Sequence, residues 1–322
     1  MAEHQEKHSE NDEHGAHDAH GGHAVNPLDP NELFGHVADA AYFHVPRKLA
    51  PAGSHGHIHI PQPFAGEKPL WRANTSIPLI NRTIEPLDLK ITKFMVIELA
   101  VAILIAVFFI GLGQALKGGV IARGRFRNML EAMLLYFRDN VAEPCIGHHD
   151  AERFVPFLWT IFFFVLGCNL FGMLPWMGSP TGSLAVTGAL AFCTFFVVMG
   201  SAVVKLGPVG TVKSFVPHMD LPFAIKIPLI PLIFAIEVVG MFIKHGVLAI
   251  RLLANMMAGH VVLAVILAFI AAAAGSVWYA VMPASVLGAT ALSLLELFVA
   301  FLQAYIFTFL SALFIGMAVH PH

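Results

Sequence analysis

Apolar residues divide the chain into a polar beginning and a long apolar remainder. Residues 1–90 are polar and rich in His, Pro and Gly, whereas apolar residues dominate from about residue 94 onward. A helix of about 20 apolar residues crosses the roughly 30 Å hydrocarbon core of a bilayer. The pattern predicts an all-α integral membrane protein, with a membrane domain over residues 91–322 after a largely irregular, His-rich N-terminal region over residues 1–90.

Three apolar runs are long enough for one crossing each, at residues 94–116, 154–176 and 184–204. Basic residues follow the first run and the third, and such residues gather on the cytoplasmic side of membrane proteins. We therefore expect the N-terminal region outside, with the three crossings alternating in direction. Residues 130–144, between the first two runs, combine helical spacing with polar groups, which favours a helix at the membrane interface.

Two longer apolar stretches follow, at residues 232–274 and 285–318. As helices they measure roughly 65 Å and 50 Å, both longer than the membrane is thick. A turn within the first stretch would fall near FIKHGVLAIR, which has one glycine and no cluster of turn-forming residues. We expect two very long tilted helices joined by a loop around residues 273–284. The total is then about five or six membrane helices, with the C-terminus on the cytoplasmic side.

Composition agrees with this class and excludes others. The chain is 57% hydrophobic and 12% charged, whereas soluble domains carry about 25% charged residues. The net charge of -2 leaves no basic stripe for nucleic acid. Three cysteines lack CxxC spacing and no HExxH motif occurs, so we expect neither a metal site nor a cofactor, and a membrane metalloenzyme is disfavoured.

The N-terminal region contains a histidine at every third position from 14 to 23. Histidine titrates near neutral pH, which allows metal capture or proton buffering. A solvated, low-complexity segment without a fixed structure accounts for the same pattern.

Polar residues inside the longest apolar stretch fall on particular helix faces. On a wheel of 100° per residue, Glu237, Lys244 and Asn255 lie within about 40° of Arg251, whereas His260 lies on the opposite side. Arg251 and these three residues form one stripe that we expect to face a partner. His260 should then face other helices of this chain, about 13 Å along the axis from Arg251, and Glu237 lies about 21 Å away in the other direction.

The last stretch contributes Glu296 and Gln303, which lie seven residues apart on one helix face. A carboxylate inside a membrane helix costs about 2.5–3.5 kcal/mol unless it faces protein or water. A hairpin would bring His260 and Glu296 to a common level, where an acid–base pair could pass protons. Arg251 stays charged and cannot relay a proton, so it is suited to be a barrier. Asn255 or Gln303 alone could simply hold helices together.

Four segments together resemble a known family. They are NLFGMLP at 169–175, EVVGMFIKHGVLAIR at 237–251, RLLANMMAGH at 251–260 and ELFVAFLQAYIFTFL at 296–310. In this order they resemble subunit a of the F-type ATP synthase. The His-rich N-terminal extension matches nothing in the family pattern.

The resemblance implies a non-catalytic, proton-translocating stator subunit in the bacterial plasma (inner) membrane, packed against a ring of c subunits and b-type peripheral stalk subunits. Such a chain carries protons through two offset aqueous half-channels, needs no cofactor and does not itself make ATP. By resemblance, Arg251 faces the ring carboxylate and separates the half-channels. The implied positions beside the proton path are His260 and Glu296 on the outer side, Glu237 on the cytoplasmic side, and Gln303 and Asn255 near Arg251.

One position departs from the family pattern. Some members have an acidic residue shortly after the asparagine of the second crossing, but this chain has Gly172 there. Asn169 is still a candidate for the outer path. The alternative function is a stand-alone secondary transporter or ion channel with Arg251 as an anion site. Such proteins often contain inverted repeats, and the sequence has none that we can identify.

Overall fold

The computed structural model describes residues 39–40, 42–44, 57–62, 91–116, 125–174, 177–215, 223–273 and 275–320. The histidine repeat at residues 14–23 and most of the predicted N-terminal region lie outside these residues. Five helices are long and apolar enough to cross a membrane: Lys93–Gly111, His148–Gly172, Leu184–Ser214, Leu229–Ala272 and Gly275–Val319. The prediction of an all-α integral membrane protein is confirmed, whereas the division into domains at residue 90 stays a prediction.

A short hairpin precedes the first helix. Strands β1 (Tyr42–His44) and β2 (His57–His59) pair antiparallel, with Phe43 opposite Ile58. The Gln62 side chain donates to the carbonyl of Ile91 at 2.7 Å and accepts from its N–H at 2.8 Å, so the amide acts as a strand partner there. These contacts fix the chain at the start of α3 (Lys93–Leu116).

The segment predicted as an interfacial helix is helical. Helix α4 (Arg125–Phe137) continues through a π-helical turn, η1 (Arg138–Ala142), into α5 (Glu143–Ile146). Gly147 has φ +93°, a conformation that glycine adopts without strain, and it separates α5 from α6 (His148–Gly172). A 3-10 turn, η2 (Pro180–Gly182), then leads into α7 (Leu184–Ser214).

Helix α7 extends ten residues beyond the predicted end at residue 204. It is kinked at Gly207, where φ is +75°, and Pro208 follows. The basic residue that we took as the end of the crossing, Lys205, forms an ion pair with Asp150 of α6. His320, just after α9, lies 3.4 Å from the same carboxylate, so one acidic side chain joins α6, α7 and the end of α9.

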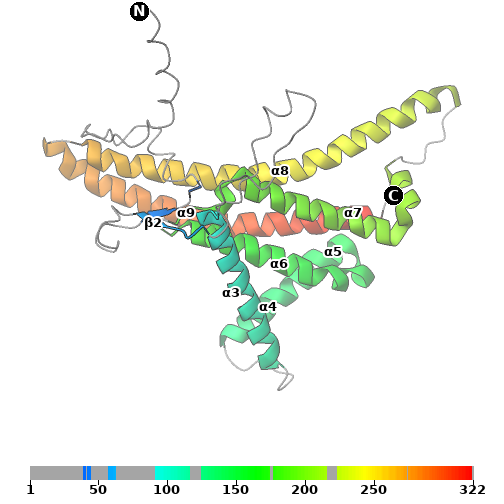
Figure 1. The fold of residues 1–322 in the computed structure, drawn as a ribbon, viewed down its shortest axis with the longest axis horizontal. Helices are drawn as coiled ribbons and strands as arrows, with labels where there is room; N and C mark the ends of the chain where they lie inside the picture. Colours follow the sequence, from blue (N-terminus) through cyan, green and yellow to red (C-terminus); the bar gives the residue numbers. More distant parts are fainter. Residues whose placement is uncertain are drawn as a thin grey trace, which may run out of the picture.

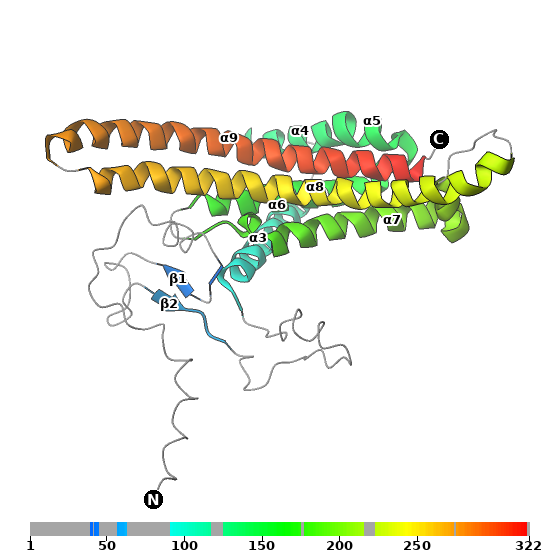
Figure 2. The ribbon, with the colours of Figure 1, turned by 90° about the horizontal axis from the view of Figure 1, so that it is seen from above.

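Helices α8 (Phe223–Ala272) and α9 (Trp278–Val319) form the predicted hairpin. They run antiparallel and side by side along the length of the molecule (Figures 1 and 2). The predicted loop at 273–284 is wrong in extent, because a 3-10 turn, η3 (Gly275–Val277), starts the return at once. Pro231 and Pro283 both lie inside helices, since a membrane helix tolerates the loss of one backbone N–H.

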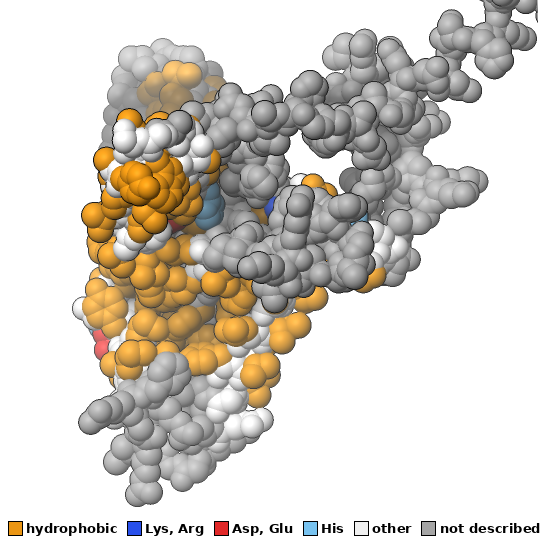
Figure 3. Space-filling model, turned by 90° about the vertical axis from the view of Figure 1, so that its left-hand side faces the viewer, with side chains coloured by type: hydrophobic (Ala, Val, Ile, Leu, Met, Phe, Trp, Pro, Cys, Tyr) orange, Lys and Arg blue, Asp and Glu red, His pale blue; other side chains and the backbone are white. Residues whose placement is uncertain are grey.

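Helix α9 belongs to the core, whereas α8 covers it. In its most apolar 18-residue stretch, half of α9 (50%) is buried, but only 11% of the corresponding stretch of α8. Small residues such as Ala300, Ala304 and Ala312 let α9 pack closely against α6. At Gly316, a Cβ would collide with the carbonyl of Cys145 in α5. Seen from the end where the hairpin turns, the described surface is mostly hydrophobic (Figure 3).

Candidate functional site between α8 and α9

His260 and Glu296 face each other across the hairpin. Their Nδ1 and Oε1 atoms are 3.6 Å apart, and the side chains are only 14% and 6% exposed. The predicted approach of these two residues is confirmed. Gly259 makes room for it, because a Cβ at this position would lie 2.7 Å from Oε1 of Glu296.

This pair keeps free hydrogen-bonding capacity. Within the described part of the chain, neither Nε2 of His260 nor Oε1 of Glu296 has a hydrogen-bond partner. A buried polar atom without a partner lowers the stability of the folded protein by about 1–3 kcal/mol. Hydrogen bonding to water, or binding of a transferable proton, would remove this loss at both atoms. A histidine and a carboxyl group at this distance can hold or release a proton at physiological pH.

A second polar contact joins the helices nearer the middle of α8. Asn255 donates from Nδ2 to Oε1 of Gln303 at 2.8 Å. Gln303 is 1% exposed, and its Nε2 has no partner among the described residues. Arg251 lies one helical turn, about 6 Å, from Asn255. The contact therefore ties the turn beside Arg251 to the buried helix α9.

Arg251 itself lies on the border between the buried and exposed faces of α8. Leu248 and Leu252 beside it are buried, whereas Ile250 is 57% exposed. No carboxylate of the described residues lies within ion-pair distance of Arg251. Glu237 and Lys244 are about half exposed and Asn255 is exposed, whereas His260 is turned inward. That this stripe faces a partner stays a prediction.

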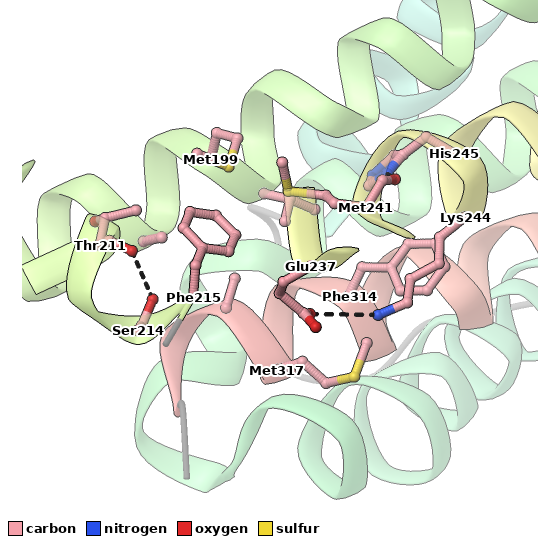
Figure 4. Close-up of a pocket in the computed structure, with 13 residues that line it drawn as sticks. Met199, Thr211, Ser214, Phe215, Glu237, Met241, Lys244, His245, Phe314 and Met317 are labelled. Atoms are coloured by element: carbon pink, nitrogen blue, oxygen red, sulfur yellow. Dashed lines mark hydrogen bonds and ion pairs between the residues drawn. The ribbon is translucent and has the colours of Figure 1, made fainter. Parts of the chain in front are cut away.

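Glu237 and Lys244 occupy the same stripe toward the start of α8. Their Oε1 and Nζ atoms are 3.9 Å apart, and both side chains are about half exposed. They also line a cavity of about 110 Å³ between α7, α8 and α9 (Figure 4). Ionisable groups thus lie on both sides of Arg251 along α8, with His260 on the other side.

Asn169 is completely buried and held by two hydrogen bonds. Its Oδ1 accepts from the Thr181 hydroxyl at 2.7 Å, and its Nδ2 donates to the Ala300 carbonyl at 3.3 Å. The side chain therefore joins α6 to η2 and to α9, one turn from Glu296. That it also lines a proton path stays a prediction.

Two ionisable residues were missed by sequence reasoning. Glu98 of α3 has a buried Oε1 without a hydrogen-bond partner in the described part. A carboxylate inside the first apolar run is costly in a membrane, and this signal could have marked it. His245 of α8 is 5% exposed and lines the cavity beside Lys244. The helical wheel could have predicted that His245 lies on the inner face of α8.

Comparison with known proteins assigns the family. The profile of the family described as ATP synthase A chain matches residues 94–316, well over half of the sequence. The chain belongs to the ATP synthase A chain family. It is accordingly a proton-translocating subunit of the membrane-embedded Fo complex.

Bacterial proteins are among the relatives of this chain. ATP synthase subunit a of Myxococcus xanthus (strain DK1622) is 44% identical over 240 residues, covering 73% of this chain and 76% of that protein. The subunit a of Chloroherpeton thalassium is 40% identical over 247 residues, with coverage of 72% and 67%. ATP synthase subunit a 2 of Chlorobaculum tepidum is 38% identical over 242 residues, with coverage of 72% and 64%. With its five long apolar helices, the chain is a multi-pass bacterial membrane protein.

Proposed function

We propose that this chain is the stator subunit that offers two offset aqueous half-channels to the carboxylates of a c-subunit ring, with Arg251 as the barrier between them. One observation carries the proposal. Arg251 lies at the exposed border of α8 without an acidic partner in the described residues, between His260–Glu296 on one side and Glu237 on the other. The two groups lie about 13 Å and 21 Å from it along the axis.

The outer half-channel delivers protons through His260 and Glu296. Their free Nε2 and Oε1 atoms can accept a proton from water and pass it toward a carboxylate on the neighbouring ring. Glu237, half exposed beside Lys244, receives protons on the cytoplasmic side. Asn169 contributes to the outer path by fixing the turn of α9 that follows Glu296.

Arg251 separates the two paths because its guanidinium stays protonated at every physiological pH. A fixed cation raises the energy of a proton that moves directly from one half-channel to the other. The same cation attracts an ionised ring carboxylate, which meets it in a medium of low dielectric constant. The hydrogen bond from Asn255 to Gln303 keeps the neighbouring turn in register with α9.

In this proposal the N-terminal region lies on the extracytoplasmic side of the membrane and the C-terminus lies in the cytoplasm. The basic residues after α3 and in α7 support this orientation. The exposed, apolar face of α8 provides the surface for the c ring, and b-type stalk subunits and lipid cover other helices.

The test is coupled ATP synthesis in membrane vesicles with the complete complex. Arg251→Ala should abolish synthesis, whereas Arg153→Ala, an exposed arginine of α6, should leave it close to wild type. Normal coupled synthesis in Arg251→Ala would refute the proposal. Transport by the purified chain without other subunits would instead support a stand-alone transporter.

A further inference from the structure

The cavity between α7, α8 and α9 contains a histidine to which no role has been given. Three ionisable residues line the cavity: Glu237, Lys244 and His245, all from α8 (Figure 4). The described lining residues of α7 and α9 contribute hydroxyl and apolar groups but no charge. A water molecule needs about 10–15 Å³ of such space, so a cavity of about 110 Å³ holds several.

The geometry of His245 defines its protonation. Nδ1 lies 2.9 Å from the carbonyl oxygen of Met241. A carbonyl only accepts hydrogen bonds, so Nδ1 carries the proton and the neutral ring keeps a lone pair on Nε2. Nε2 is buried and has no partner among the described residues. The rings of Phe195 and Phe314 pack on the imidazole with centroids 5.4 Å and 5.0 Å away, and they offer Nε2 no conventional hydrogen bond.

A purely structural role does not explain this choice of residue. The slot between Phe195 and Phe314 is aromatic, and phenylalanine would fill it without a polar atom. A buried acceptor without a partner destabilises the folded protein. The ring lines a cavity together with two charged side chains, Glu237 and Lys244.

Along α8, His245 lies between Glu237 and Arg251, where its Nε2 could carry a proton along the interval between them. His245 lies six residues, about 9 Å, from Arg251 and eight residues, about 12 Å, from Glu237. It therefore divides the interval of about 21 Å between these two residues into two shorter steps, each short enough for a few water molecules.

We propose that His245 is a proton-carrying residue of the half-channel that contains Glu237. This inference rests on the function proposed above. Water in the cavity gives a proton to the lone pair of Nε2, which makes an imidazolium with two N–H groups. The same proton then leaves to water or to the Glu237 carboxylate and restores the neutral ring.

The experiment measures passive proton flux through Fo in vesicles from which the catalytic sector has been stripped. His245→Phe keeps an aromatic ring between Phe195 and Phe314 but removes both nitrogens. His245→Ala opens space for added imidazole. His149→Phe, an exposed histidine of α6, is the matched control. Co-purification of the c ring with each variant checks assembly.

We expect His245→Phe and His245→Ala to assemble and to lower the flux about tenfold or more. Added imidazole should restore flux in His245→Ala, and His149→Phe should conduct like wild type. The wild-type flux should change between about pH 5 and 8, where histidine titrates, and His245→Phe should lose part of that dependence. If the phenylalanine variant does not assemble, His245→Gln replaces it, because glutamine can donate to the Met241 carbonyl but cannot carry a proton.

Two results would overturn the role of His245. One is a wild-type flux and pH profile in His245→Phe or His245→Gln. The other is a loss of flux that imidazole does not restore and that leaves the pH profile unchanged, since packing alone would then explain it. Either result, with normal wild-type flux and an Arg251→Ala variant that does not synthesise ATP in the complete complex, rejects the role of His245 and leaves the proposed function intact.

Discussion

Gly259 controls how closely Glu296 approaches His260, and adding one methyl group there tests the pair. A Cβ in Gly259→Ala would lie 2.7 Å from Oε1 and 3.0 Å from Cδ of Glu296. Ordinary contact begins at 3.4 Å, so the carboxylate must withdraw by about 0.7 Å to remove the overlap with Oε1. It withdraws away from α8 and therefore away from His260, whose Nδ1 is already 3.6 Å distant.

Stability should change little, whereas proton transfer should suffer. Overpacking a buried site costs about 1–3 kcal/mol, and replacing a helical glycine by alanine gains about 1 kcal/mol. The net loss of about 0–2 kcal/mol is small enough for assembly. A misplacement of about 1 Å can slow a positioned reaction by about 100-fold, so a shift of 0.7 Å should reduce proton pumping about tenfold.

The assay is ATP-driven proton pumping in inverted membrane vesicles, normalised to the amount of assembled complex. Gly246→Ala in the same helix is the matched control, because nothing lies within 4 Å of its Cβ. Glu296→Asp alone should also pump less than wild type, because the shorter side chain withdraws the carboxylate from His260 without any overlap. Equal pumping by Gly259→Ala, Gly246→Ala and wild type would refute the importance of this distance.

Two further predictions concern the same hairpin. Exchanging the pair through His260→Glu and Glu296→His should retain more coupled ATP synthesis than either single change, because the acid and the base remain opposite each other; a double variant no better than both singles would contradict this. Gly316→Ala should destabilise the complex by about 1–3 kcal/mol, because its Cβ would overlap the Cys145 carbonyl, and thermal unfolding of purified Fo would measure the loss. Gly111→Ala in α3, with nothing within 4 Å, should leave the unfolding temperature unchanged, and equal temperatures for the two variants would reject the overlap.

The long helices could be predicted because apolar runs of this length are typical of membrane-spanning helices. Their ends could not. The predicted stretches begin shortly after Pro231 and Pro283, but both prolines lie inside helices, and the chain reverses at Gly275, where φ is +64°. Prolines mark helix ends reliably only where no neighbouring helix or side chain satisfies the carbonyl that they release.

The sequence could predict which polar residues of α8 and α9 lie at the same height along the hairpin, because the position of the turn sets the register of the two helices. His260–Glu296 and Asn255–Gln303 are both centred on about residue 278, where the chain reverses. The contacts themselves required the three-dimensional structure. Wheel angles place Asn255 near Arg251 but do not say that its amide reaches Gln303, since this depends on how α8 is rotated against α9. His245 was missed for the same reason, because its aromatic neighbours come from α7 and α9.

Burial of the two long helices explains why the polar contacts lie between them. Helix α9 is fixed by close packing against α6, whereas α8 has little apolar surface buried within the described chain. A helix held mainly by hydrocarbon contacts in a membrane has no hydrophobic force that fixes its rotation. The hydrogen bond from Asn255 to Gln303 and the approach of His260 to Glu296 supply that orientation. They hold α8 with Arg251 at its outer border, so the groups proposed to carry protons also set the angle at which the barrier meets its partner.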